Sequence, residues 1–398
     1  MASDLSGRQL TIAPTPTAHF GIGAIREIGP LASATKASVA VIVTDAGLLA
    51  TPVMESVRGV LAAAGVPAVM FGGVHANPTA DDIAAGAEVV ARCAEPGDAV
   101  LVAVGGGSSI DAAKGIALAA VNPQRGRDLD YRRAFANSAL PILAVPTTAG
   151  TGAETNAFGV FTDPAAKTKF YVGDRTTMPA AAVLDPALTV GLPSQATAAT
   201  GFDALTHAIE SYLSVRANPW SDGIALRVVA MVAGHLARAC RDGADLEARS
   251  QLLLASHMAG IGMATTGLGL AHAIGHALGG RYDIAHGITL AMVLPPVLAF
   301  SAPARSERLA ALAFAFGAAD PGKDDDWNAA ACIDAVTALR SEIGLAMTPA
   351  SFGVGAAAYR GIARAALDDD VLANTPRQPA AADIETMLAA ADDCVRIV

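Results

Sequence analysis

The chain has 398 residues, of which 53% are hydrophobic and 16% charged, and its formal net charge is −10. This length exceeds the roughly 250–300 residues at which one hydrophobic core stops growing, so we expect two domains. The composition is typical of a globular protein and excludes a disordered or fibrous chain. The acidic balance, without a run of Lys or Arg, argues against nucleic acid or an anionic membrane surface as a partner.

The first half of the sequence alternates two kinds of segment. Short, β-branched runs at 37–45, 67–74, 98–107 and 140–152 predict buried strands, and amphipathic stretches at 49–65, 79–93 and 109–121 predict helices. Such alternation is typical of a parallel α/β sheet. We therefore expect an α/β domain over residues 1–187.

The second half is a succession of helical stretches with few β-branched runs. These stretches are 196–215, 219–242, 245–265, 268–280, 288–300, 305–316, 327–343 and 381–394. We expect an all-helical domain over residues 188–398, so the fold class is α/β plus all-α. Gly, Pro or charge interrupts the apolar stretches before the ~18–20 residues that a membrane span requires, so we expect no membrane association.

The four cysteines, Cys93, Cys240, Cys332 and Cys394, lie far apart and form no CxxC pair. This spacing predicts reduced thiols rather than a disulfide framework. The N-terminal residues MASDLSGRQL lack the basic start and apolar run of a secretory signal. We therefore expect a cytoplasmic protein.

Three loops at predicted strand ends suggest a dinucleotide site. Gly105 to Gly107 lie between a strand and a helix start, where backbone N–H groups can approach a phosphate. Asp45 closes an earlier strand, where a carboxylate accepts hydrogen bonds from a ribose and disfavours the 2′-phosphate of NADP. The segment PTTAGTG (146–152) adds hydroxyls and N–H groups. Each loop alone is equally compatible with an ordinary turn, and neither a GxGxxG nor a Walker pattern is present.

Histidines cluster in the second half, where AHAIGHALGGRYDIAHG (271–287) contains three of the eight in the chain. His272 and His276 share one helix face, as do Asp203 and His207 in GFDALTHAIESY, and His286 follows a Gly-rich bend. One carboxylate with several imidazoles suits Fe²⁺ or Zn²⁺. Spacing alone allows His272 and His276 to exchange the roles of ligand and neighbouring proton-transfer residue.

These segments, in this order, resemble the iron-dependent (group III) alcohol dehydrogenases. The most specific motifs are GGGSSIDAAKGIA, PTTAGTGAE, GFDALTHAIESY and GLGLAHAIGHALGG…AHG, and the resemblance extends from residue 20 to residue 387. It implies an N-terminal NAD-binding domain and a C-terminal helical metal and substrate domain, as in dehydroquinate synthase-like proteins. It also implies a homodimer or larger homo-oligomer.

The activity implied by the resemblance is reversible hydride transfer between NAD(H) and a small alcohol or its carbonyl partner, assisted by a divalent metal. The implied metal ligands are Asp203, His207, His272 and His286, with Fe²⁺ expected and Zn²⁺ possible. His276 then matches a residue near the substrate that takes part in proton transfer. The expected cofactor contacts are Asp45, Asn77, Gly106, Gly107, Ser108, Thr147, Thr148, Thr151, Asn156 and Lys169.

Departures from the family pattern affect the substrate rather than the chemistry. Asn156 and Ala157 replace threonine and proline, Pro296 replaces a common histidine, and His257 occupies a position that is normally aliphatic. The physiological substrate therefore stays open among small alcohols and aldehydes.

Three other functions are compatible with parts of the pattern. A metal- and NAD-dependent lyase or cyclase resembling dehydroquinate synthase needs several cations for its substrate, whereas residues 268–287 offer only Arg281. Maleylacetate reductases typically lack the aspartate ligand, whereas Asp203 is present here. A nucleotide sensor with a closed, four-ligand structural metal is the third alternative, although His276 beside the site favours catalysis.

Overall fold

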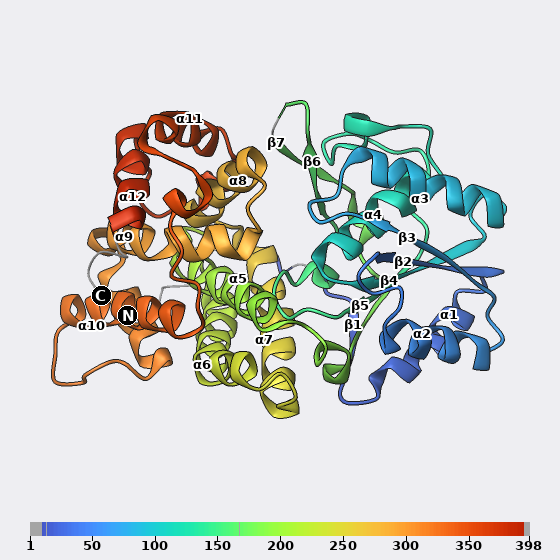
Figure 1. Ribbon diagram of the computed structural model, residues 1–398, viewed down its shortest axis with the longest axis horizontal. Coiled ribbons are helices and arrows are strands. Elements are labelled where there is room, and N and C mark those ends of the chain that lie inside the picture. Colours follow the sequence, from blue (N-terminus) through green and yellow to red (C-terminus); the bar gives the residue numbers. More distant parts are fainter. Residues whose placement is uncertain (1–9, 13, 167, 394–398) are drawn as a thin grey trace. The chain divides into compact units, whose positions relative to one another are not determined.

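The computed structural model describes residues 10–393 except 13 and 167, and the chain divides into two compact units. The first, here called the sheet unit, comprises Thr15–Leu192. The second, the helical unit, comprises the chain from Pro193 onward together with the described residues before Thr15. Both are drawn in Figure 1. The division falls after Leu192, later than the boundary after residue 187 that the sequence suggested. The turn at Pro186–Thr189 belongs to the sheet unit because it packs with the last strand of the sheet.

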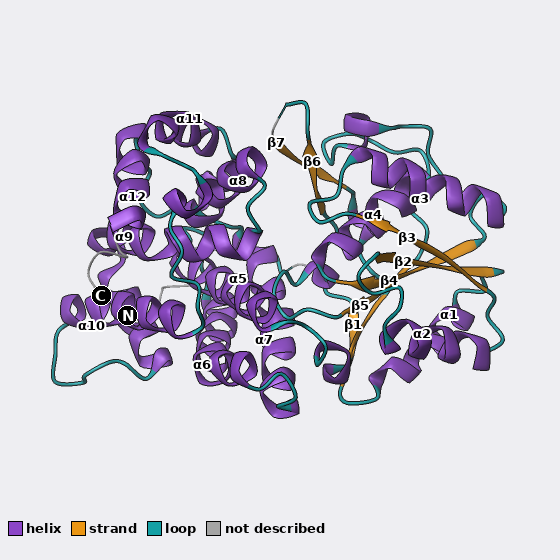
Figure 2. Ribbon diagram, in the orientation of Figure 1, coloured by secondary structure: helices purple, strands orange, loops and turns teal. Residues whose placement is uncertain are grey.

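The sheet unit is built on six strands in the order β1-β8-β5-β4-β2-β3, and all neighbours are parallel. Their bounds are β1 Thr17–Phe20, β2 Val39–Asp45, β3 Ala68–Val74, β4 Ala99–Gly105, β5 Ile142–Pro146 and β8 Ala181–Leu184. Figure 2 shows these strands between helices. The parallel α/β architecture expected from the sequence is confirmed.

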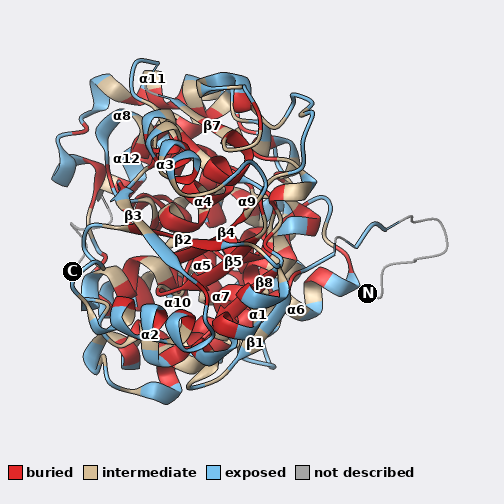
Figure 3. Ribbon diagram, turned by 90° about the vertical axis from the view of Figure 1, so that its right-hand side faces the viewer, coloured by how far each residue is buried: buried red, intermediate tan, exposed pale blue. Residues whose placement is uncertain are grey.

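Helices cover both faces of this sheet. Alternate residues of β2, β4 and β5 pack on one face with α3 (Ala80–Cys93) and α4 (Gly107–Ala119), and the others pack on the opposite face with α1 (Ile28–Ala34) and α2 (Pro52–Ala63). The central strands are therefore buried on both sides, as Figure 3 shows, which explains their unbroken hydrophobic runs. The chain goes outward from β2 to β3 and then returns past β2 to β4, so the strand order reverses between β2 and β4. Open α/β sheets bind ligands at such a point.

The sheet unit also contains an antiparallel hairpin that the sequence did not predict. Its strands are β6 (Gly159–Asp163) and β7 (Thr168–Val172). Phe161 and Phe170 face the core that α3 and α4 share with this hairpin. The hairpin is thus an integral part of the sheet unit.

The helical unit contains eight α-helices in its described part, which confirms the all-helical second half. They are α5 Ser194–Leu213, α6 Pro219–Arg241, α7 Leu246–Thr266, α8 Leu270–Tyr282, α9 His286–Phe316, α10 Asp325–Glu342, α11 Ala356–Leu367 and α12 Ala381–Asp393. Helix α9 spans two expected helices, and the non-helical backbone of Arg305 (φ −145°, ψ 29°) marks the break between them. Helix α11 was not predicted.

Two of these helices, α6 and α9, are long and apolar enough by length and composition to cross a membrane, and the bent pair α7 and α8 meets the same criterion together. Gly, Pro and charged residues therefore leave longer apolar stretches in these helices than we expected from the sequence. In α9, 67% of the most apolar window is buried within the protein. Its apolar residues therefore mainly serve packing against neighbouring helices.

Candidate functional site

Helix α5 presents three polar side chains on one face. Asp203, His207 and Glu210 follow one another at the i, i+4, i+7 spacing of a single helix face. All three are buried, with residue exposures of 2%, 4% and 7%. Because burying a polar group without a partner is costly, their polar atoms need partners inside the helical unit.

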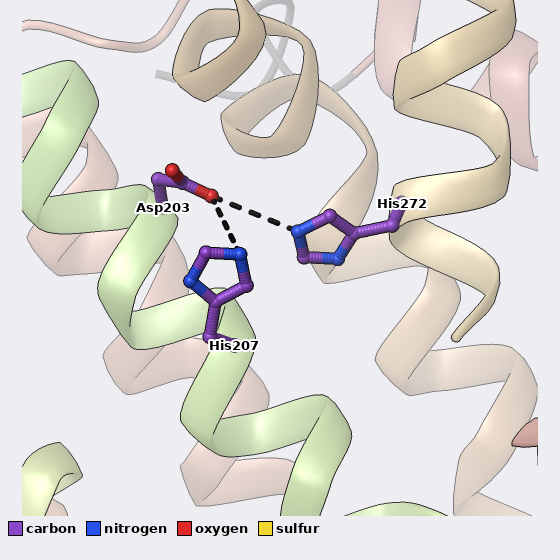
Figure 4. Close-up of side chains that lie close together, drawn as sticks. All are labelled: Asp203, His207 and His272. Atoms are coloured by element: carbon purple, nitrogen blue, oxygen red, sulfur yellow. Dashed lines mark ion pairs between the residues drawn. The ribbon is translucent and has the colours of Figure 1, made fainter. Parts of the chain in front are cut away.

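Asp203, His207 and His272 converge on a common point, shown in Figure 4. Asp203 Oδ1 lies 3.3 Å from His207 Nε2 and 3.6 Å from His272 Nε2. One ligand atom from each residue lies within 4.8 Å of the other two. The rings of His207 and His272 are stacked with centroids 4.7 Å apart, so α5 and α8 bring the two imidazoles together.

His286 approaches the same carboxylate from the first residue of α9. Its Nε2 lies 3.7 Å from Asp203 Oδ1, and its ring centroid lies 5.3 Å from that of His272. The His286 side chain is more exposed than those of Asp203, His207 and His272, with 26% of it accessible. The backbone beside it is tightly packed, because a Cβ on Gly287 would lie 2.0 Å from Ala199 O of α5.

Glu210 holds the second nitrogen of His272. Its Oε2 lies 2.6 Å from His272 Nδ1, and the same carboxylate accepts hydrogen bonds from the N–H groups of Gly269 (2.8 Å) and Ala271 (2.6 Å) at the start of α8. Because an ionised carboxylate only accepts hydrogen bonds, His272 Nδ1 donates to Glu210, and Nε2 is the ring nitrogen that faces Asp203. Carboxylate–histidine pairs of this kind orient the imidazole ligands of metals. Glu210 was not among the residues expected from the sequence.

The residues present fit a divalent cation. Asp203 Oδ1 and His272 Nε2 are buried and receive no hydrogen bond from any described residue. Burial alone raises the pKa of Asp203, but the imidazoles of His207, His286 and His272 outweigh it and hold the pKa well below its usual value. Burial lowers the pKa of His272, yet Glu210 and Asp203 together raise it to about 9. Two carboxylates thus create a site that favours positive charge, and its donors are those of iron and zinc sites.

His276 lies one turn beyond His272 on α8 but belongs to a different contact. Its Nδ1 is 2.7 Å from Asp369 Oδ2, and its ring centroid is 6.0 Å from that of His272. Among the described residues, it is His272 and not His276 that shares the compact group with Asp203 and His207. The structure therefore separates two histidines whose roles spacing alone left interchangeable.

The three loops expected to bind a dinucleotide lie at the carboxyl ends of neighbouring strands of the sheet unit. Asp45 ends β2, Gly105 ends β4, and Thr147 follows β5, where its N–H donates to Gly105 O at 2.9 Å. A Cβ on Gly105 would lie 3.5 Å from Asp45 Oδ2, so the carboxylate lies beside the glycine turn. This edge is next to the reversal of strand order between β2 and β4.

The glycine turn is packed against the threonine loop. A Cβ on Gly107 would lie 2.6 Å from Thr151 Cγ2, and a Cβ on Gly106 would lie 3.3 Å from Thr148 Cγ2. Gly106 is the N-cap of α4, and the first N–H groups of a helix have no partner within the helix. The turn thus offers backbone donors and a positive dipole end beside threonine hydroxyls, which fits a pyrophosphate.

The remaining expected cofactor residues lie in the sheet unit in different settings. Asn77 adopts a left-handed backbone (φ 56°), Ser108 lies in the first turn of α4, and Lys169 is on β7. Asn156 has internal contacts as well, because its Oδ1 accepts hydrogen bonds from Lys114 Nζ (3.1 Å) and Phe158 N (2.9 Å).

Lys114 organises the segment that follows the threonine loop. Its side chain is fully buried, and Nζ donates to Ala153 O (2.8 Å) and Phe158 O (2.6 Å) and forms an ion pair with Asp111 Oδ1 (3.3 Å). Asp111 in turn accepts from Val160 N at 3.0 Å. The lysine of the GGGSSIDAAKG motif is therefore a structural residue that ties α4 to residues 153–160.

Two of the departures noted in the sequence lie inside helices of the helical unit. Pro296 is inside α9, directly after Pro295, and His257 is buried on α7 with 5% exposure. Neither belongs to the compact group of Asp203, His207 and His272.

A parallel α/β sheet with a glycine turn and a helical unit with a buried aspartate–histidine centre are the two parts expected of a metal- and nucleotide-dependent enzyme. Family models agree in both halves. The model described as iron-containing alcohol dehydrogenase matches residues 14–186, and that of the C-terminal part of the Fe-containing alcohol dehydrogenase family matches residues 197–391. The chain belongs to the iron-containing alcohol dehydrogenase family.

Individual relatives cover nearly the whole chain. The NAD-dependent methanol dehydrogenase of Bacillus methanolicus is 35% identical over 373 residues, which are 94% of this chain and 97% of that protein. The 1,3-propanediol dehydrogenase of Klebsiella pneumoniae is 35% identical over 361 residues, 90% of this chain and 92% of that one. The expected family and the expected alcohol dehydrogenase class are thereby confirmed.

Solved structures give the same result. A 1,3-propanediol oxidoreductase superposes with a TM-score of 0.92 at 33% identity, covering 96% of this chain and 100% of the other. Sulfoacetaldehyde reductase from Bifidobacterium kashiwanohense in complex with NAD⁺ superposes with a TM-score of 0.87 at 26% identity, covering 96% and 99%. The fold assigned to each half is therefore that of proteins with known structures.

Proposed function

We propose that the protein catalyses the reversible, NAD(H)-dependent interconversion of a small alcohol and its carbonyl compound, with a divalent metal held in the helical unit. The observation that carries this proposal is the buried convergence of Asp203, His207 and His272 in a chain of this family. Methanol and 1,3-propanediol, named for the relatives, set the expected size of the substrate.

Asp203, His207, His272 and His286 are the residues that would hold the metal. Fe²⁺ is the proposed ion, because it is the metal of the family name, and Zn²⁺ is the alternative because the same donors accept both. A divalent cation there supplies Lewis acidity toward a substrate oxygen. Asp203 contributes the single negative ligand, and Glu210 keeps His272 Nε2 directed at the site.

NAD supplies the hydride acceptor, and the sheet unit supplies the groups for its binding. The pyrophosphate is proposed to bind at the glycine turn, together with Ser108, Thr148 and Thr151. Asp45 is proposed to accept hydrogen bonds from the adenosine ribose. Asn77, Thr147 and Lys169 complete the proposed contacts, whereas the internal hydrogen bonds of Asn156 favour an indirect role through the position of its loop.

His276 is the proposed proton-transfer residue. It lies beside the metal residues, with its ring stacked on that of His286 at a centroid distance of 5.5 Å. It is therefore close enough to exchange a proton with a group bound next to the metal, and a histidine suits this task near neutral pH.

The first test combines metal analysis of the purified protein with NAD⁺ reduction assayed over a panel of methanol, ethanol, butanol, 1,2-propanediol and 1,3-propanediol. We expect about one equivalent of iron or zinc per chain and steady net formation of NADH with at least one alcohol. Asp203→Ala is expected to lose both the metal and the activity. Full activity of the metal-free variant would refute the proposal, and NADH that turns over on the enzyme without net release would support the lyase alternative.

Cytoplasmic location and assembly into a homodimer or larger homo-oligomer stay proposals. Sedimentation of the purified protein tests the assembly. Cell fractionation with an antibody tests the location. A monomer at micromolar concentration, or recovery in the membrane or secreted fraction, would refute the respective proposal.

A further inference from the structure

Asp369 is a buried carboxylate that faces His276. Its Oδ2 lies 2.7 Å from His276 Nδ1, and 14% of its side chain is exposed, compared with 8% for His276. Its other oxygen, Oδ1, accepts a hydrogen bond from Val371 N at 3.1 Å, where Asp369 caps the short helix Asp370–Asn374. The carboxylate is therefore held in place by its own backbone segment, independently of α8.

The hydrogen bond determines which nitrogen of His276 carries the proton. Burial alone raises the pKa of Asp369, but the hydrogen bonds from His276 Nδ1 and Val371 N help to keep the pKa below its usual value. The ionised carboxylate only accepts hydrogen bonds, so Nδ1 of a neutral His276 must be the N–H and Nε2 must hold the lone pair. The ring plane is also fixed, between this hydrogen bond and the stacked ring of His286 at 5.5 Å.

The same arrangement occurs twice on α8, one turn apart. Glu210 accepts from Nδ1 of His272, and Asp369 accepts from Nδ1 of His276. In the first pair the remaining nitrogen, Nε2, lies among the metal residues at 3.6 Å from Asp203 Oδ1. In the second pair the histidine stands outside the compact group of Asp203, His207 and His272.

We propose that Asp369 is a positioning residue for proton transfer, which fixes the Nδ1–H tautomer and the orientation of His276 so that Nε2 accepts the substrate's hydroxyl proton. This inference rests on the proposed function of His276. The proton moves from the alcohol oxygen to Nε2, which gives an imidazolium stabilised by the Asp369 carboxylate, and it then passes to solvent. Asp369 itself stays ionised.

The first experiment replaces the carboxylate by the isosteric amide in Asp369→Asn. The amide can turn its NH₂ toward Nδ1, which reverses the tautomer and leaves Nε2 protonated. We expect kcat for alcohol oxidation to fall by roughly 10²-fold, with KM for the alcohol and the metal content within about twofold of the unmodified protein. Asp368→Asn, one residue earlier and exposed, is the matched control and is expected to retain kcat. Unchanged kcat in Asp369→Asn, or loss of metal, would overturn the inference.

A double-mutant cycle separates positioning from general stability. If Asp369 acts through His276, adding Asp369→Asn to His276→Ala should change kcat by less than twofold, because the residue that it positions is already gone. If the two substitutions multiply, Asp369 has an independent structural role and the inference is wrong. A His276→Ala variant with full kcat would also overturn it, while leaving the alcohol dehydrogenase activity intact.

The tautomer can be read without any activity measurement. Long-range ¹⁵N–¹H spectra of the zinc-loaded, ¹⁵N-histidine-labelled protein, with the His276 signals assigned by their loss in His276→Ala, report the protonation of each ring nitrogen. We expect a protonated Nδ1 and an unprotonated Nε2 in the unmodified protein, and a change of this pattern in Asp369→Asn only. The opposite tautomer in the unmodified protein would overturn the inference. A protein that shows the expected tautomer but reduces no NAD⁺ with any alcohol would instead refute the proposed function.

Discussion

Glu210 and His272 are joined by a hydrogen bond of 2.6 Å between Oε2 and Nδ1 inside the helical unit. Glu210 comes from α5, which also carries Asp203 and His207, whereas His272 comes from α8. The same carboxylate accepts two backbone N–H groups at the start of α8. One side chain therefore fixes both the direction of a proposed metal ligand and the position of the helix that carries it.

Glu210→Gln should weaken metal binding. The amide offers one acceptor oxygen where the carboxylate serves three donors, so the hold on His272 Nδ1 loosens and its Nε2 is no longer directed at the site. We expect the metal affinity to fall roughly 10- to 100-fold, measured by competition with a chromogenic chelator. Glu247→Gln, on the exposed face of α7, is the control and should retain full affinity. Unaltered affinity in Glu210→Gln would show that His272 is oriented without it.

Removing the metal should destabilise the helical unit. The converging acceptors Asp203 Oδ1, His207 Nε2 and His272 Nε2 lose their shared positive partner, and a ligand present at 100 times its Kd stabilises a protein by about 2.7 kcal/mol. For a domain of about 200 residues this corresponds to a fall in Tm of roughly 5–10 °C, measured by calorimetry with and without chelator. Asp203→Ala should show a low Tm that no chelator changes. Equal Tm values with and without chelator in the unmodified protein would contradict the prediction.

Lys114→Met should destabilise the sheet unit. The substitution leaves Asp111 without its ion-pair partner and leaves the carbonyl groups of Ala153 and Phe158 without their donor. Breaking a buried ion pair from one side costs about 3–5 kcal/mol. Urea unfolding, followed by circular dichroism, measures this loss. The exposed Lys36→Met should change the free energy of unfolding by less than about 0.5 kcal/mol; a similarly small change in Lys114→Met would mean that the lysine is dispensable.

Asp45→Ser should relax the preference for NAD⁺ over NADP⁺. The carboxylate at the end of β2 disfavours a 2′-phosphate by charge, and a hydroxyl removes that charge while keeping a polar side chain. We expect the ratio of kcat/KM for NADP⁺ to that for NAD⁺ to rise at least ~10-fold, which is about 1.4 kcal/mol of discrimination. Steady-state kinetics with both cofactors measures the ratio, and an unchanged ratio would place the ribose elsewhere.

Cys332 should resist alkylation in the folded protein. Burial raises the pKa of its thiol to about 12, and the residue is fully buried, whereas Cys93 and Cys240 are partly exposed. We expect iodoacetamide at pH 8 to modify Cys332 far more slowly than Cys93 and Cys240, as read from peptide mass spectra, until denaturant is added. Equal modification of all three in the native protein would contradict the packing around α10.

The sequence predicted the sheet core because the strands buried on both faces have unbroken hydrophobic runs. It missed the hairpin β6–β7, whose strands are five residues each and carry polar residues such as Thr162 and Lys169 between apolar ones. It divided α9 at residues 300–305 for a physical reason, since the backbone of Arg305 does leave the helical region there. Short strands and kinks depend on tertiary packing, which periodicity does not encode.

The helical repeat of 3.6 residues places Asp203 and His207 on one face of α5, but it does not predict which histidine of α8 joins them. The same rule could have found Glu210, which lies seven residues after Asp203 on the same face of α5. Asp369 carried no such signal, because it is one of three consecutive aspartates and lies 93 residues from His276 in the sequence. Asn156 also has a contact that its place beside the threonine loop did not suggest, because its Oδ1 accepts a hydrogen bond from Lys114 Nζ.

The close packing of Gly287 against Ala199 limits how far the start of α9 can move when the proposed metal site changes its occupant. With a backbone oxygen only 2.0 Å from where a methyl group would stand, the start of α9 has no room to shift toward α5. If His286 holds the metal, we expect a cation of different radius to be accommodated by rotation of the His286 ring rather than by sliding of the helix. Exchanging one metal for another should therefore alter the angles around the ion more than the fold that surrounds it.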